Sequence, residues 1–330
     1  MVENRDRSLA KSFFGLISQK PYFSGIVPLL IIFAVMAVAN PVFFAADNMI
    51  DMARTASYTF ILAAPYTFLM ILGNIDLTMG AVISLGGVVC AKCLLSGMSI
   101  PLAILVVVGV CCIIGVVKAY IIFHFNLPPF IITLGLQYMI NGIVLVWTEG
   151  IAITGLPKEF KIVGQGSIFP GTRFFTTILI ALIEAAIFYF LLEKTKFGRS
   201  ICAVGGNRET SRMAGIRVNF YLYAGHILVS VFAGLLGVLY ASRFASAITT
   251  IGSGKELTTI AATVIGGTSM FGGSGTIVGT LIGCFLFAVI TNALIMAGVS
   301  TYWQNFVFGL ILILAIILDK FRRDAATRIN

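Results

Sequence analysis

The sequence predicts an all-α polytopic membrane protein with about ten transmembrane helices, one of them broken or re-entrant, and with both termini in the cytoplasm. Of the 330 residues, 59% are hydrophobic and 11% are charged, whereas a soluble domain carries roughly 25% charged residues. The apolar residues gather in runs close to the ~20 residues that a helix needs to cross a bilayer. The composition excludes an ordinary soluble enzyme, a nucleic-acid-binding domain and a disordered protein.

A polar, basic tail, 1–24, precedes the predicted transmembrane domain, 25–318. Pro101 and Pro128 stand at helix starts, where a missing backbone N–H costs least. The run at 256–268 is too short to cross ~30 Å of hydrocarbon as one regular helix, so we expect it to be broken or re-entrant. The ten candidate spans lie at about 25–44, 57–73, 78–96, 101–123, 130–148, 174–193, 219–240, 256–268, 276–296 and 303–318.

The basic residues predict the orientation of these spans. The N-terminal tail holds four Lys and Arg residues, segment 194–217 holds six, and the C-terminal tail, 319–330, holds four of the 22 in the chain. Because cytoplasmic loops carry the excess of basic residues, we expect all three segments in the cytoplasm. Lys92 and Lys118 fall near predicted helix ends, from which their side chains can reach the membrane surface. The net charge of +9 is therefore a sign of topology, and no nucleic-acid partner is predicted.

Two Gly-rich stretches interrupt the apolar runs, one in each half of the chain. The first is 73–80, and the second runs over 266–275. Paired interruptions of this kind can mark the binding site of a transporter. The glycines of the second stretch also favour close packing of helices.

Two carboxylates lie within or beside apolar runs. Asp76 is flanked by apolar runs on both sides, and a carboxylate at membrane depth is kept mostly for a pathway or an ion pair. The alternative is that Asp76 caps the following helix. Its carboxylate would then accept hydrogen bonds from the free N–H groups in the first turn of that helix. Glu184 lies in the middle of the sixth span, where a hydrogen-bonding partner on a neighbouring helix would account for it.

Segment 194–217 contains a short helix between two long spans. Asn207 is a good N-cap, residues 208–214 can form two turns, and Gly215 offers a left-handed stop. The alternative is a solvated loop whose charges only set the topology. The glycines at 198, 205, 206 and 215 favour a defined shape that suits docking to a partner.

No catalytic residue, metal site or cofactor site is predicted in the chain. The stretch 252–255, GSGK, resembles the end of a phosphate-binding loop, but Thr249 replaces its first Gly and Glu256 replaces its hydroxyl residue. Cys90 and Cys93 form a C-x-x-C pair without a second pair or a nearby His. We interpret these two cysteines as small packing residues one helical turn apart.

Four stretches together resemble the membrane permease subunit of bacterial ATP-binding-cassette importers, in the ribose/monosaccharide branch that also includes branched-chain amino-acid permeases. Stretch 73–80, GNIDLTMG, is similar to the family's G-G-I-D-L-S-x-G, with Asn74 and Thr78 as departures. Stretch 127–135 is similar to L-P-x-F-I-x-T-L-G. The other two lie at 195–216, which is similar to the family's cytoplasmic loop, and at 256–276. The resemblance covers about residues 40 to 320.

The resemblance implies a permease in the bacterial plasma membrane that carries a pentose, a hexose or a related small polar solute by alternating access. It also implies a permease dimer, of two copies or two related chains, an extracytoplasmic solute-binding protein and a cytoplasmic ATPase that binds ATP and Mg. This chain itself is then no enzyme. The candidate ATPase-coupling residues are Gly198, Arg199, Gly205, Asn207, Arg208, Arg212, Gly215 and Ile216. The candidate pathway or gate residues are Asn74, Asp76, Thr78, Thr133, Gly266, Gly267 and Thr268.

Three alternatives stay open at the level of sequence. The same machinery could carry a nucleoside or an amino acid. A secondary transporter could use Asp76 and Glu184 as coupling acids. An intramembrane enzyme could use Ser274, which would require His226 within hydrogen-bond reach of that hydroxyl.

Overall fold

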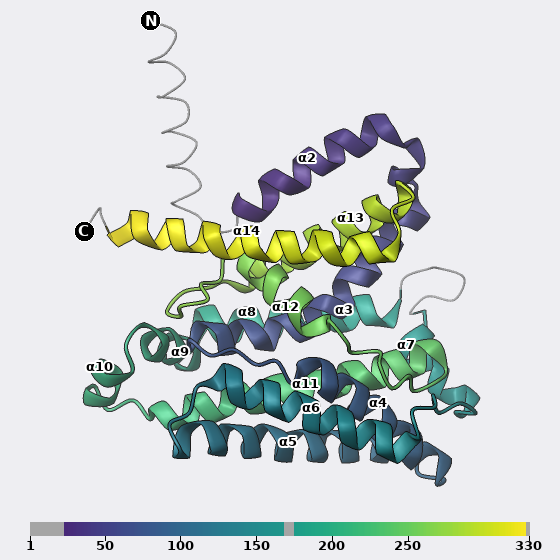
Figure 1. The fold of residues 1–330 in the computed structure, drawn as a ribbon, viewed down its shortest axis with the longest axis horizontal. Helices are drawn as coiled ribbons and strands as arrows, with labels where there is room; N and C mark the ends of the chain where they lie inside the picture. Colours follow the sequence, from purple (N-terminus) through teal and green to yellow (C-terminus); the bar gives the residue numbers. More distant parts are fainter. Residues whose placement is uncertain (1–22, 168–174, 328–330) are drawn as a thin grey trace, which may run out of the picture.

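The computed structural model describes residues 23–167 and 175–327, and the predicted N-terminal tail thus lies almost wholly outside the described residues. Each of the ten predicted spans corresponds to one helix (Figure 1). These helices are α2 (Phe23–Ala39), α3 (Ala46–Ile71), α4 (Met79–Leu95), α5 (Ile100–His124), α6 (Pro129–Thr148), α8 (Thr176–Lys194), α11 (Val218–Phe244), α12 (Lys255–Ile265), α13 (Ile277–Met296) and α14 (Thr301–Thr327).

Five of the described helices are long and apolar enough to cross a membrane by length and composition: α5, α6, α8, α11 and α13. Proline stands in the first turn of α5 and of α6, as predicted. Helix α12 has 11 residues and is therefore about 16 Å long, too short to cross hydrocarbon alone. Helix α14 continues to Thr327, so most of the predicted C-terminal tail is helical.

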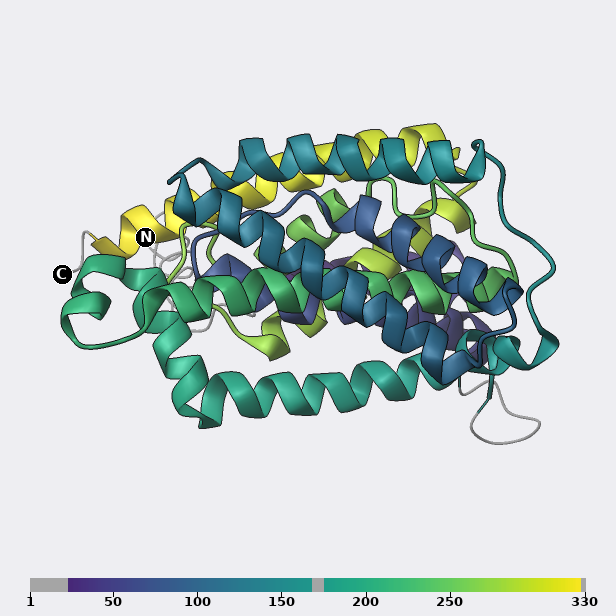
Figure 2. The ribbon, with the colours of Figure 1, turned by 90° about the horizontal axis from the view of Figure 1, so that it is seen from below.

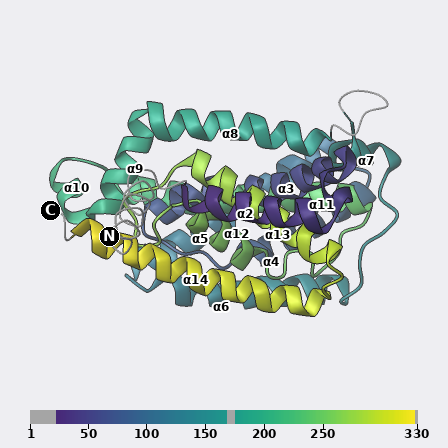
Figure 3. The ribbon, with the colours of Figure 1, turned by 90° about the horizontal axis from the view of Figure 1, so that it is seen from above.

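The long helices run side by side along the longest axis of the molecule (Figure 1). Helix α11 packs against both α4 and α5. The two helices α11 and α4 cross closely because a glycine of each lies at the crossing. A Cβ on Gly86 of α4 would lie 2.6 Å from the Cα of Gly234 of α11. Small residues allow this approach of two membrane helices. The opposite side of the bundle is formed by α2, α13 and α14 (Figure 3).

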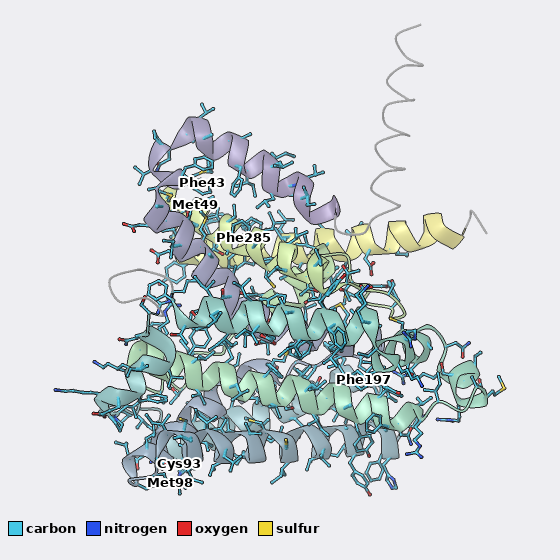
Figure 4. The ribbon with its side chains drawn as sticks, turned by 180° about the vertical axis from the view of Figure 1, so that it is seen from behind. Phe43, Met49, Cys93, Met98, Phe197 and Phe285 are labelled. Atoms are coloured by element: carbon cyan, nitrogen blue, oxygen red, sulfur yellow. The ribbon has the colours of Figure 1, made fainter. Side chains whose placement is uncertain are left out.

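A second, smaller apolar cluster joins α2 to α3 and α13. Its buried members Phe43 and Met52 pack with Met49 and Phe285, which are partly buried, and Figure 4 shows Phe43, Met49 and Phe285 close together at this end of the bundle. The rings of Phe33 and Phe43 meet edge to face at 5.8 Å. This cluster holds α2 against the rest of the protein.

Two short helices lie together at one end of the bundle: α9 (Lys196–Gly206) and α10 (Arg208–Met213). The C-terminal end of α14 lies at the same end (Figures 1 and 2). The opposite end holds the short elements η2 (Lys158–Phe160) and α7 (Lys161–Gln165). The remaining short element, η1 (Pro41–Phe44), connects α2 to α3.

Candidate functional site

The short helix expected in segment 194–217 is present as α10, with both predicted ends. The Asn207 side chain accepts hydrogen bonds from the backbone N–H groups of Glu209 and Thr210, each at 3.0 Å. Gly215 follows the helix with φ +81°, the left-handed conformation that favours glycine. Next to it, the Ile216 N–H donates to the Ser211 carbonyl at 3.0 Å. Local capping therefore fixes the shape of α10.

A tight turn connects α8 to the start of α9. Thr195 caps it by accepting from the Gly198 N–H at 3.4 Å. A Cβ at Gly198 would collide with the carbonyl of Leu192 at the end of α8, so glycine is required for this close approach. The candidate coupling residues Arg199 and Arg212 are exposed, and the neighbouring Met213 is 78% exposed. The pair α9–α10 thus presents basic and apolar side chains outward at one end of the bundle.

Three distant stretches of backbone meet around the carbonyl of Ile71, the last residue of α3. The Gly273 N–H donates to this carbonyl at 2.8 Å. A Cβ at Gly205, in α9, would overlap the same oxygen, and a Cβ at Gly272 would lie 2.9 Å from it and 3.1 Å from the Cα of Gly73. We call this contact the Ile71 junction. It joins the candidate coupling segment to both Gly-rich stretches.

Arg208 makes a further contact between α10 and the first Gly-rich stretch. Its guanidinium donates to the Leu72 carbonyl at 3.1 Å and to the Asn74 side-chain oxygen at 3.4 Å. Partial burial lowers the pKa of this guanidinium from its ordinary value. Asn74 itself is 1% exposed and also donates to the Leu72 carbonyl. The coupling candidate Arg208 and the pathway candidate Asn74 are therefore direct neighbours.

Asp76 is completely buried and has partners on both carboxylate oxygens. Its Oδ1 accepts from the Thr78 backbone N–H at 2.8 Å and from the Thr78 hydroxyl at 2.6 Å. Its Oδ2 pairs with the ammonium of Lys118 and lies 3.9 Å from Nδ1 of His226. Asp76 thus forms the ion pair that was one of its expected roles; it does not cap the N–H groups of α4 directly but holds Thr78, the N-cap residue of that helix.

The position of Lys118 corrects the sequence-based expectation. Its side chain does not extend to the membrane surface; it is 0% exposed and also donates to the Thr78 hydroxyl at 3.2 Å. The reason is that Lys118 lies on the face of α5 turned toward stretch 73–80, where the Asp76 carboxylate compensates its charge. Sequence reasoning missed Lys118 and His226 as members of this group. One signal for this group is present in the sequence: Lys118 is a basic residue inside α5, the most hydrophobic of the candidate spans.

The remaining pathway candidates do not join the Asp76 group. The Thr133 hydroxyl donates to the Pro129 carbonyl of its own helix at 2.8 Å. Gly266 lets α12 approach α13, since a Cβ there would collide with the backbone of Gly279, in line with the packing role expected of the glycines. Gly267 adopts φ +92° after α12, and Thr268 is buried. None of these four positions contacts the Asp76 group in the contacts described, and the Thr268 hydroxyl has no hydrogen-bond partner among the described residues.

One further expectation changes, and one alternative lacks the contact that it requires. Glu184 is 5% exposed, yet neither of its carboxylate oxygens has a hydrogen-bond partner among the described residues, so the expected partner on a neighbouring helix is missing there. His226 is turned toward Asp76, and neither of its nitrogens forms a hydrogen bond with a described residue, Ser274 included. The contact that an intramembrane serine enzyme would need is therefore not formed.

The chain has extensive similarity to known permeases. It matches the model of a family described as "Branched-chain amino acid transport system / permease component" over residues 48–316. It is 34% identical to the ribose import permease protein RbsC of Bacillus subtilis (strain 168) over 310 residues, 93% of this chain and 94% of that protein. It is 33% identical to the galactose/methyl galactoside import permease protein MglC of Escherichia coli (strain K12) over 328 residues, 94% and 97% of the two chains. No solved structure matches significantly.

Proposed function

Since the chain belongs to the family of permease components of branched-chain amino acid transport systems, we propose that it is the membrane permease subunit of an ATP-driven importer for a monosaccharide. The assignment of a sugar rests on relatives whose names specify ribose and galactose import, each aligned over about nine-tenths of both chains. The solute is then a ribose-like pentose, a hexose or a related small polar molecule.

The partners follow from the same proposal. A separate cytoplasmic ATPase binds ATP and Mg and hydrolyses the ATP, an extracytoplasmic binding protein delivers the solute, and a second permease chain completes the pathway in the plasma membrane. Both termini and segment 194–217 then face the cytoplasm. Two observations support this orientation: basic residues concentrate in these segments, and the C-terminal end of α14 lies at the same end of the bundle as α9 and α10 (Figure 2).

One observation carries the proposed mechanism: the Ile71 junction joins the coupling segment directly to both Gly-rich stretches. The ATPase docks on α9 and α10, and ATP binding displaces them. Because the junction consists of backbone packed on backbone, the displacement is passed to residues 71–74 with little loss. Arg208 and Asn74 reinforce the same contact. The start of α4, held by Asp76 and Thr78, then moves with the coupling segment during alternating access.

Reconstitution tests this function. The purified chain is placed in liposomes with its partner ATPase and binding protein, and uptake of labelled ribose, galactose, leucine and adenosine is measured. We expect ATP-dependent uptake of a monosaccharide. ATP-dependent uptake of leucine or adenosine alone would favour the other cargoes of the same machinery. Uptake driven by a proton or Na⁺ gradient without the ATPase would overturn the proposal in favour of a secondary transporter.

A further inference from the structure

Two shortened helices begin beside each other inside the protein. Helix α4 starts at Met79 and α12 at Lys255, and a Cβ on Gly80 would collide with the carbonyl of Gly252, just before α12. The Gly252 N–H donates to the Ser84 hydroxyl of α4 at 3.3 Å. The first N–H groups of a helix have no partner within it. The positive dipole ends of both helices therefore lie close to one small region.

The carboxylate of Glu256 lies in this region. The residue is 7% exposed, and its Oε1 accepts a hydrogen bond from the Gln137 side-chain amide of α6 at 3.2 Å. Its Oε2 lies against Gly80, where a Cβ would collide with it, and has no hydrogen-bond partner among the described residues. The backbone N–H groups of Gly254 and Glu256 are also near the carboxylate. An unsatisfied buried carboxylate oxygen is costly, so this arrangement favours a role for Oε2 outside the fold itself.

The Glu256 carboxylate is buried, and its partner Gln137 lies at the edge of the packed core. Gln137 is half-buried, and Leu257, the residue after Glu256, is 49% exposed. Helix α12 contacts both α4 and α14, and α6 contacts α4, and the hydrogen bond from Gln137 to Glu256 joins α6 to α12; Figure 1 shows α12 between α6 and α14. Both polar side chains are therefore near the face that α6 and α14 border.

We propose that Glu256 and Gln137 bind hydroxyl groups of the transported solute. A carboxylate accepts hydrogen bonds from hydroxyls, and an amide both donates and accepts, which matches neutral polyols such as monosaccharides. The same negative charge disfavours phosphorylated or carboxylated solutes. This inference rests on the proposed function and adds to it the residues that recognise the solute within the membrane.

The test compares a sugar with its deoxy analogues in the complete transporter, reconstituted with its ATPase and binding protein. For wild type, Glu256→Gln and Gln137→Leu, the uptake rate of each singly deoxygenated ribose or galactose is divided by that of the parent sugar. Every variant uses the same binding protein, so the contribution of that protein cancels when variant and wild type are compared. Glu149→Gln, an exposed carboxylate at the end of α6, is the matched control.

We expect wild type and Glu149→Gln to discriminate against at least one deoxy analogue by about tenfold, the loss expected for one hydrogen bond to a charged group. For that analogue, both site variants should discriminate about tenfold less than wild type does, whatever the binding protein contributes to all four proteins. If Glu256→Gln fails to fold, Gln137→Leu decides the outcome alone, because Gln137 lies at the edge of the site. Unchanged discrimination in the folded site variants would overturn this inference and leave the importer assignment intact. A wild-type protein that transports no monosaccharide would instead refute the assignment, and the site with it.

Discussion

Lys118 and Asp76 form an ion pair in which neither side chain is exposed to solvent. The pair joins α5 to the stretch between α3 and α4, and Thr78 contacts both members of the pair. Breaking a buried pair by removing one partner leaves an uncompensated charge, at a cost of ~3–5 kcal/mol. A neutral pair of similar size costs much less.

We therefore expect Asp76→Asn and Lys118→Met to lower the melting temperature of the purified protein clearly, and the double variant to recover most of the loss. Fluorescence-detected thermal unfolding in detergent measures this. The three proteins should also be assayed for uptake and for stimulation of the ATPase. A double variant that is stable but does not transport would show that the pair acts in the pathway. Single variants as stable as wild type would contradict the ion pair.

Gly205 and Gly206 are adjacent in α9 but differ in their surroundings. A Cβ at Gly205 would overlap the Ile71 carbonyl, whereas a Cβ at Gly206 would meet nothing within 4 Å. Gly205→Ala should therefore destabilise the protein by about 1–3 kcal/mol and impair ATP-driven uptake, and Gly206→Ala should behave as wild type. Melting temperature and uptake are measured for both. Equal behaviour of the two variants would argue against the Ile71 junction.

Substitutions at the two ends of α10 should have different effects, because Asn207 acts through its side chain and Gly215 through its backbone conformation. Asn207→Ala removes a cap worth ~1 kcal/mol, too little to unfold the protein but enough to loosen α10. Gly215→Val should uncouple ATP hydrolysis from uptake while the permease stays inserted, because a β-branched residue resists φ +81°. Gly215→Asn is the control, since Asn tolerates this conformation. Normal uptake and normal co-purification of the ATPase with Gly215→Val would refute the coupling role.

Labelling of single cysteines tests the orientation. In a variant without the six native cysteines, Arg208→Cys should react with a membrane-impermeant maleimide only after the cells are opened. Lys158→Cys, exposed at the opposite end of the bundle, should react in intact cells. The native Cys202 would be a poor probe, because burial, and then the nearby Glu193, raise the pKa of its thiol. Labelling of position 208 in intact cells would show that segment 194–217 faces the outside, opposite to the proposed orientation.

Glu184→Gln separates the importer from a proton-coupled transporter. Neither Glu184 oxygen has a hydrogen-bond partner among the described residues, so an amide of the same shape should fit without loss of folding. We expect ATP-driven uptake at the wild-type rate in proteoliposomes. Loss of uptake by a well-folded Glu184→Gln protein would show that this carboxylate takes part in transport.

The sequence predicted those parts of the site that depend on local chemistry. The ends of α10 could be predicted because Asn207 and Gly215 act within four residues of their own positions. The partner of Asp76 could not, because Lys118 is 42 residues away along the chain and nothing in the pattern of α5 indicates which face meets stretch 73–80. Periodicity is uninformative in a helix that is apolar all round.

The partner of Gly205 was unpredictable for a related reason. Gly205 was expected to be important for the shape of segment 194–217, but a close approach of backbones leaves no side-chain signature at the carbonyl, and Ile71 looks like any apolar residue. The role of Glu256 could not be predicted from the sequence, because it follows the GSGK stretch, 252–255, that resembles the end of a phosphate-binding loop. The contacts of its carboxylate with Gly80 and Gln137 join residues far apart in the chain, so only the fold reveals them.

The Ile71 junction is made of main-chain atoms, and its only demand on the side chains is their absence at Gly205 and Gly272. The contact through which we propose that movement passes is therefore separate from the side chains of α6 and α12 that we propose recognise the solute. Substitutions at Gln137 or Glu256, where we propose that the solute is recognised, should therefore leave the junction unaltered. If both proposals hold, a change of solute requires no change at the coupling contact.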